Sequence, residues 1–326
     1  MSNECAFPPP VVAVDVVQRV EPVILYGCEL FAIRPTVYAK LDALQGSWAR
    51  QILGFSGQYD FRAALSVAFC GWRQRLGSKA IGRATVYLAK IQLLPTEHPT
   101  ARMVLASVST VGETWVSSVK ELMFTFPVPI PCILESGLIS NDDLTRARGD
   151  AKWRKILVTK YKTQVVFPAL CSRDDAEFHR EASKFLLGLG VTYYDLVPQR
   201  SSQGWDRLLP LLNVEDWKLV KVWALIRLTG KWPATWVGGS ENVVTLLQCP
   251  RCHQQHITVL HSLYSCVGTM ADFLDSDLMP HVSRQFPIQC FVASLFHSSV
   301  SAEVDAARAK FVGRIILRLL SEAAPL

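Results

Sequence analysis

Cys249-Pro250-Arg251-Cys252, followed by His261 and Cys266, is the stretch with the clearest structural consequence, and its spacing is C-x2-C-x8-H-x4-C. Zinc favours four thiolate or imidazole ligands in a tetrahedron, and a two-residue gap lets a tight turn bring two sulfurs to one metal. We therefore expect a closed zinc site of Cys249, Cys252, His261 and Cys266. The alternative is a small apolar core that contains ordinary reduced cysteines.

Two further histidines compete for the imidazole position. Using His256 would change the spacing to C-x2-C-x3-H-x9-C, which leaves a cramped first loop and a long second one, so His261 is preferred. His253 directly follows a ligand and is expected at the surface. A closed site of this kind has no open coordination position, so it is expected to be structural, supplying folding free energy to a short segment.

Composition limits the class of protein. The 326 residues are 50% hydrophobic and 19% charged, which predicts a folded chain with room for two or three modest domains. An odd number of cysteines, nine, and no basic-then-apolar leader favour an intracellular setting, nucleus or cytoplasm. No apolar run reaches the length of a membrane span, so no membrane partner is expected. The net charge of +6 permits contact with nucleic acid but does not demonstrate it.

Apolar residues recur at helical spacing along the chain, which predicts a mainly α fold. One helix is expected to begin at Pro35 and to end before Gly54. The expected organisation is a loose leader, a helical region, a linker with a basic helical region, and a zinc-binding region with a terminal helix; these cover residues 1–20, 21–125, 126–235 and 236–326. Further helices are expected at 72–94, 102–120, 138–165, 219–226 and 304–319, and an extended segment at 126–131.

Two basic clusters are candidates for contact with phosphates. No carboxylate occurs between residues 72 and 94, and such a face can neutralise a nucleic-acid backbone. The second cluster surrounds Trp153 and Tyr161, whose rings could stack bases. Ordinary solvated helix faces are the alternative for both. The candidate residues are Arg73, Arg75, Lys79, Arg83 and Lys90 in the first cluster, and Lys152, Arg154, Lys155, Lys160 and Lys162 in the second.

The sequence offers no catalytic constellation. Phosphate-binding glycine loops, nucleophile elbows and H-E-x-x-H pairs are absent from it. Paired acids could hold metals for a polymerase or nuclease, but only on a rigid strand turn. Asp142-Asp143 follow Ser-Asn and are typical of a helix start, and Asp174-Asp175 lie in a polar stretch. No catalytic residue is therefore assigned.

Several blocks together resemble the C-terminal part of the reverse transcriptases of non-LTR (LINE-type) retrotransposons. Ile24-Leu-Tyr-Gly-Cys-Glu-Leu-Phe31, Leu41-Asp-Ala-Leu-Gln45 and Arg50-Gln-Ile-Leu-Gly54 resemble the segment after the polymerase palm. Ala224-Leu-Ile-Arg-Leu-Thr-Gly230, followed by the Cys249–Cys266 pattern, is similar to the family's zinc-binding end. Ile257 and Phe31 depart from the usual Glu and Trp.

The resemblance implies a thumb-like helical region over residues 21–125 and binding of RNA, DNA or both. It also implies, as a partner, the rest of a retroelement polyprotein. The family's aromatic-Ala-Asp-Asp turn is absent from this sequence, so the resemblance does not imply polymerase activity of this chain alone. Open alternatives are a portion that completes a polymerase supplied in trans, an inert relic, and a protein-interaction scaffold.

Overall fold

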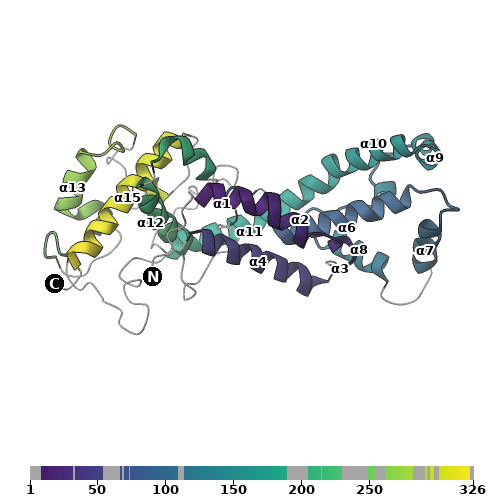
Figure 1. Ribbon diagram of the computed structural model, residues 1–326, viewed down its shortest axis with the longest axis horizontal. Helices are drawn as coiled ribbons and strands as arrows, with labels where there is room; N and C mark the ends of the chain where they lie inside the picture. The colour runs from purple at the N-terminus through teal and green to yellow at the C-terminus, as the bar shows by residue number, and fades with distance from the viewer. Residues whose placement is uncertain are drawn as a thin grey trace. The chain divides into compact units, whose positions relative to one another are not determined.

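The fold is mainly helical, as predicted. The computed structural model describes residues 9–31, 34–53, 67, 70–72, 74–108, 114–188, 205–213, 215–229, 249–254, 261–281, 291, 294–296 and 301–323, and these contain no strand (Figure 1). Across these ranges, no helix combines the length and the apolar character that a membrane span requires.

The contacts divide the chain into two compact units. The first unit comprises residues 1–14, 46–73 and 178–326, and the second comprises residues 15–45 and 74–177. These boundaries differ from the expected division, because residues on both sides of position 126 belong to the second unit. The two units are described separately below.

The second unit is built around α6 (Leu76–Gln92). This helix contacts α3 (Cys28–Phe31), α7 (Pro99–Val108), α8 (Trp115–Phe124) and α10 (Ala151–Tyr161). The unit also contains η1 (Val16–Val20), α2 (Glu21–Ile24), η2 (Ile133–Glu135), α9 (Asn141–Gly149) and η3 (Lys162–Val166), with parts of α4 (Pro35–Leu53) and α11 (Phe167–Gly188).

One apolar core joins residues that the sequence assigned to separate regions. Leu88 of α6, Leu122 of α8 and Tyr161 at the end of α10 are buried in the same cluster. The proline-rich segment contributes to it as well: Ile130 is buried there, and the carbonyl oxygen of Pro131 accepts a hydrogen bond of 2.8 Å from the Tyr161 hydroxyl. The segment at 126–131 is therefore part of a core and does not separate two compact units.

Helix boundaries in the second unit follow from capping. Ser140 is the N-cap of α9: its hydroxyl accepts a hydrogen bond from the backbone N–H of Asp143, whose side chain accepts one from the Ser140 N–H in return. Asp150 caps α10 in a similar way, so the predicted helix at 138–165 is two helices. The predicted helix at 102–120 is also two, because Thr114 caps a new helix, α8. Similarly, α6 begins at Leu76 rather than residue 72.

The first unit is organised around two helices, α12 (Asp216–Thr229) and α15 (Ala302–Ala323), which pack along each other. Trp223 of α12 is buried, and its indole N–H donates a 2.9 Å hydrogen bond to the carbonyl oxygen of Leu295. The predicted helices at 219–226 and 304–319 lie within these two elements. The unit also contains η6 (Trp205–Leu211), η8 (His261–Ser265) and α13 (Val267–Leu274).

The expected loose leader at residues 1–20 is wrong for its second half. Residues 9–15 form the helix α1 (Pro9–Asp15), which η1 continues. Ala13 is buried, and its carbonyl oxygen accepts a 3.1 Å hydrogen bond from the indole N–H of Trp72. A proline at a helix start is favourable, because its fixed φ suits the first turn. Residues 1–8 and Gly54 lie outside the described residues.

Gly313 allows the close contact between α12 and α15. A Cβ at this position would lie 2.6 Å from the carbonyl oxygen of Leu219 and 2.7 Å from its Cα. Those atoms are backbone, so α12 would have to move to make room. We expect Gly313→Ala to lower the free energy of unfolding by about 1–3 kcal/mol, measured by denaturant titration. Gly149→Ala is the matched control, because beyond its chain neighbours and the backbone of its own helix no atom lies within 4 Å of its Cβ position. An equal, small effect of both substitutions would contradict this packing.

Candidate metal centre and candidate nucleic-acid interface

The four predicted metal ligands converge in the first unit. One ligand atom from each of Cys249, Cys252, His261 and Cys266 lies within 4.8 Å of the other three. The sulfurs of Cys249 and Cys266 are 3.8 Å apart, and the Cys252 sulfur is 3.3 Å from the His261 Nε2. Thiolates bound at about 2.3 Å around a tetrahedral ion stand about 3.8 Å apart, so this group could hold a metal ion.

Local backbone structure places the ligands. The Cys249 N–H bonds to the Gln254 carbonyl at 2.9 Å, and the His253 N–H bonds to the Cys249 carbonyl at 2.8 Å. His253 adopts a left-handed φ of 58° and is exposed, so its predicted surface position is confirmed. Cys266 follows η8, and its N–H bonds to the His261 carbonyl at 2.8 Å. These two turns bring the two ligand pairs to the same place.

The thiols differ in their electrostatic surroundings. Burial raises the pKa of Cys249 above its ordinary value. Burial also acts against ionisation of Cys266, but this residue is the N-cap of α13, and the N–H groups of Thr269 and Gly268 favour its thiolate. Its pKa is therefore lowered. The N-terminus of a helix stabilises a negative charge, and the thiolate is the form of cysteine that binds a metal.

Charged side chains beside the four Cys and His residues connect the turn at residues 249–252 to α13 and α15. Arg251 stands between the two cysteines of the pair, and its guanidinium donates a 2.6 Å hydrogen bond to Asp272 of α13. Arg318 of α15 also binds Asp272. The Arg251 guanidinium also lies against Gly268: a Cβ at position 268 would be 2.8 Å from the guanidinium carbon. The turn that carries Cys249 and Cys252 is thus attached to α13 by an ion pair.

His256, the alternative imidazole ligand, lies outside the described residues, as do Ile257 and Gly230. His261 is buried, with 6% of its surface exposed, and it reaches the three sulfurs. The described residues thus place one imidazole among the thiols, and it is the one the spacing favoured.

Most of the first basic cluster is engaged inside the second unit. Arg75 forms an ion pair of 2.9 Å with Asp42, and Lys79 forms one with Glu21. The Arg83 guanidinium donates a 2.7 Å hydrogen bond to the carbonyl oxygen of Leu25. These cations therefore do not form the single solvated face that the sequence suggested. Lys90 is exposed, and Arg73 lies outside the described residues.

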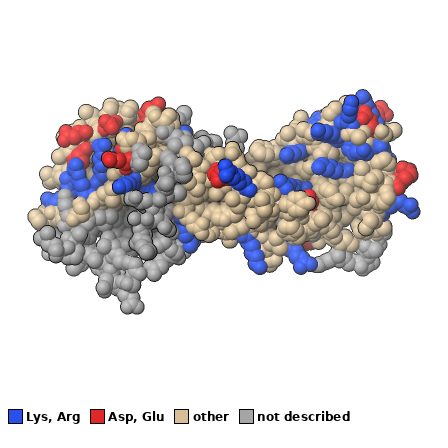
Figure 2. Space-filling view, viewed as in Figure 1, with Lys and Arg blue, Asp and Glu red and all other residues tan. Residues whose placement is uncertain are grey.

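The second basic cluster is more exposed. Lys152, Lys155 and Lys160 lie on the solvent side of α10, and Figure 2 shows Lys and Arg gathered over α9 and α10. Arg154 is half-buried, and its guanidinium donates a 3.4 Å hydrogen bond to the carbonyl oxygen of Leu93, beyond the end of α6. Arg154 therefore has a structural contact within the unit.

The aromatic residues of this cluster are placed differently from the prediction. Tyr161 is 1% exposed and belongs to the core, so the suggestion that it stacks bases is wrong. One face of Trp153 is covered by Arg146, whose guanidinium lies 4.0 Å from the ring centroid. The exposed side of α10 thus presents amino groups, but neither Tyr161 nor the covered face of Trp153 is available beside them for stacking.

Three acidic residues bind α6 or the residue before it, and nothing in the sequence indicated these contacts. Asp42 accepts a 2.8 Å hydrogen bond from the Gly77 N–H, and buried Asp174 accepts one of 2.6 Å from the Ser78 hydroxyl and one of 3.1 Å from the Arg75 N–H. Glu21 is the third. No spacing pattern in the sequence links these acids to α6, because each lies far from its partners along the chain. Asp174 thus supports the start of α6.

Comparison with known proteins adds no relative. No family model, curated protein or solved structure matches this chain.

Proposed function

We propose that this chain is a zinc-stabilised helical module that binds nucleic acid through the exposed lysine face of α10, defined by Lys152, Lys155 and Lys160. The observation that supports this proposal most strongly is that these three amino groups are exposed and unpaired by any carboxylate among the described residues. Cations that form no ion pair among the described residues are available to replace the counterions of a phosphate backbone.

The metal of this module is zinc. Three thiolates and one imidazole are a preferred ligand set for structural zinc, and the separations between their atoms suit tetrahedral coordination. All four coordination positions are filled by protein atoms, so the ion has a structural role. Its binding stabilises the turn at residues 249–254 against η8 and α13.

The proposed origin of the module is the C-terminal part of a reverse transcriptase-like retroelement protein. The order of the sequence blocks supports this origin, with the Ile24–Gly54 blocks before the Cys249–Cys266 pattern. The proposal assigns no polymerase step to this chain, because it lacks the carboxylate turn that holds catalytic metals. Template RNA, primer and target DNA are the corresponding ligands.

Nucleic-acid binding is expected to depend on salt. If the three lysines each contact a phosphate, the logarithm of affinity falls with the logarithm of salt concentration at a slope of about −2 to −3. Replacing Lys152, Lys155 and Lys160 by Ala is expected to flatten the slope by about one for each lost contact. Fluorescence anisotropy with labelled single-stranded RNA and DNA and with a duplex, over a salt series, measures this.

A matched control has the same change in net charge. Lys40, Arg102 and Lys218 are exposed cations elsewhere, and their replacement by Ala changes the net charge of +6 by the same amount. This variant should keep most of the slope. Equal slopes for the two triple variants, or a slope near zero for the unchanged chain, would remove the lysine face of α10 as the binding surface.

A further inference from the structure

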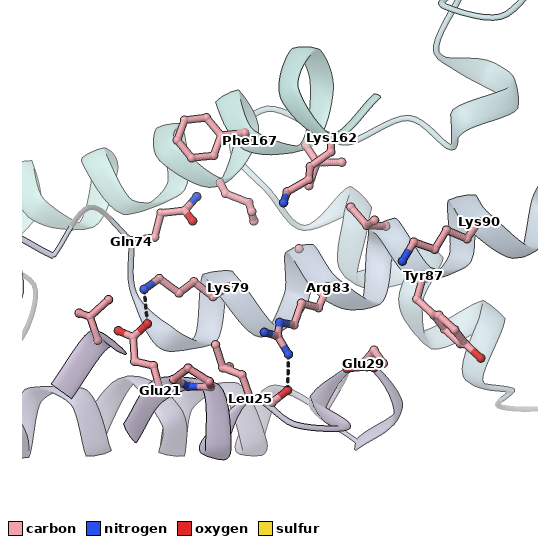
Figure 3. Close-up of a pocket in the computed structure, with 16 residues that line it drawn as sticks. Glu21, Leu25, Glu29, Gln74, Lys79, Arg83, Tyr87, Lys90, Lys162 and Phe167 are labelled. Atoms are coloured by element: carbon pink, nitrogen blue, oxygen red, sulfur yellow. Dashed lines mark hydrogen bonds and ion pairs between the residues drawn. The ribbon is translucent and has the colours of Figure 1, made fainter. Parts of the chain in front are cut away.

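A cavity of about 490 Å³ lies within the second unit, apart from the lysine face. Its walls come from η1, α2, α3, α6, η3 and the start of α11, and Figure 3 shows the residues that line it. This volume falls within the range of about 300–1,000 Å³ that is typical of sites for small molecules.

The cavity is positively charged. Lys79, Arg83, Lys90 and Lys162 line it together with two carboxylates, Glu21 and Glu29, which leaves a formal excess of two positive charges. Lys79 and Arg83 already have partners, Glu21 and the carbonyl oxygen of Leu25. Lys90 and Lys162 are exposed, and no ion pair with either is found among the described residues. The cavity thus offers two amino groups to an anion.

Two residues that line the cavity, Glu21 and Gln74, each carry a buried polar atom, one an acceptor and the other a donor. The Glu21 side chain is 5% exposed; its Oε2 binds Lys79, whereas its Oε1 has no hydrogen-bond partner within the described residues. The Nε2 of Gln74 is likewise buried without one. Buried polar atoms normally have partners, so this acceptor and this donor indicate a ligand with a complementary donor and acceptor.

The rest of the cavity wall is apolar and includes two aromatic rings. Val166 and Leu170 line it with Tyr87 and Phe167, and the Phe167 side chain is 43% exposed. In Figure 3, Glu21, Gln74 and Phe167 lie toward one end and Lys90 and Tyr87 toward the other, with Lys162 between. One end therefore combines a ring with a donor and an acceptor, and the rest supplies cations.

We propose that this cavity binds a nucleoside phosphate, either a free nucleotide or one nucleotide unit of a strand. The base packs against Phe167, and its polar edge bonds to Glu21 Oε1 and Gln74 Nε2; the phosphate binds Lys90 and Lys162. A base has both a flat apolar face and an edge with adjacent donors and acceptors, and a phosphate matches the excess of positive charge. This site is separate from the lysine face and does not depend on it.

Calorimetric titration of the zinc-loaded full chain tests the proposal. The probes are the four nucleoside 5′-monophosphates, ribose 5-phosphate and adenosine. At least one monophosphate is expected to saturate one site per chain and to bind more tightly than ribose 5-phosphate and adenosine. Loss of two charge-assisted contacts in Lys90→Ala/Lys162→Ala is expected to weaken it about tenfold or more. Both lysines are exposed, so this variant should fold.

Two further variants separate this site from others. Lys152→Ala/Lys155→Ala, on the lysine face, should leave binding of the monophosphate unchanged. Glu21→Gln should reduce the preference for the monophosphate over ribose 5-phosphate. A short single strand that competes with the monophosphate would show that the site accepts a nucleotide unit of a strand; a strand that does not compete would restrict it to free nucleotides.

Three results would overturn the proposal. The first is no saturable binding of any monophosphate at millimolar concentration. The second is equal binding of ribose 5-phosphate, which would show a site for an anion alone. The third is unchanged affinity in Lys90→Ala/Lys162→Ala. None of these affects the salt-dependent strand binding assigned to α10, so the two proposals fail separately.

Discussion

The purified chain is expected to contain about one zinc ion per molecule, and Cys249→Ala is expected to contain almost none. The Cys249 side chain is fully buried, and its sulfur lies 3.8 Å from the Cys266 sulfur. Water therefore cannot take the place of the lost sulfur unless the site opens. Structural zinc contributes about 10–16 kcal/mol of apparent binding free energy in small domains. Elemental analysis and loss of zinc to a chelator, followed with a chromogenic dye, measure the result.

The choice of control sharpens this metal test. His253→Ala removes an exposed imidazole next to a ligand and should retain the metal, whereas His261→Ala should lose it. Retention in His261→Ala with loss in His256→Ala would reassign the imidazole ligand. Full zinc in Cys249→Ala and Cys252→Ala would refute the site. Since the ligands lie in the first unit, the lysine face of α10 should keep its local structure in these variants.

Asp42→Ala is expected to lower the free energy of unfolding by about 3–5 kcal/mol, because it breaks a buried ion pair and leaves its partners behind. The Asp42 side chain is 5% exposed and pairs with Arg75 at 2.9 Å and Arg173 at 3.6 Å. It also accepts the Gly77 N–H at the first turn of α6. Denaturant titration followed by tryptophan fluorescence measures the loss.

Asp42→Asn separates the charge from the hydrogen bond. Burial raises the pKa of Asp42 above its ordinary value, although the guanidinium groups of Arg75 and Arg173 oppose this. The folded state therefore holds the proton more tightly than the unfolded state. The part of the stability that depends on protonation of this carboxyl is therefore present below its unfolded pKa and is lost as pH rises through its folded pKa, whereas the hydrogen bond from the Gly77 N–H is accepted by both forms.

An amide is uncharged at any pH and can still accept the Gly77 N–H, so Asp42→Asn should cost less than half as much as Asp42→Ala at pH 7. Asp15→Ala is the control for an exposed pair, because Asp15 and Arg19 are 53% and 79% exposed in their side chains. It should cost about 0.5 kcal/mol or less. Equal losses in Asp42→Ala and Asp42→Asn would mean that the charge alone stabilises the start of α6.

The metal group was predictable because its geometry is mostly local. Cys249 and Cys252 are joined by one turn, and His261 and Cys266 by another, so the spacing already restricted where the atoms could lie. The choice of His261 over His256 used only loop length. The helices were predictable for a similar reason: the apolar period of α4 and α15 extends over many residues.

The basic residues show where local reasoning ended. Between residues 72 and 94 the sequence contains cations and no carboxylate, and this pattern predicted either a face that binds phosphates or an ordinary solvated helix face. The partner of Lys79 is Glu21, 58 residues away, and the partner of Arg75 is Asp42 on another helix. No spacing rule links positions so far apart, because chain folding alone brings them together.

By itself, the sequence determined the helical class, the four Cys and His residues that could hold a metal ion, and the helix start at Pro35, all of which depend on residues close to one another along the chain. Only the tertiary structure decided which cations remain available, that Tyr161 belongs to the core, and that Glu21 and Gln74 line one cavity with Lys162. The physical reason is that burial and ion pairing depend on neighbours across the fold, whereas capping and ligand spacing depend on neighbours along the chain.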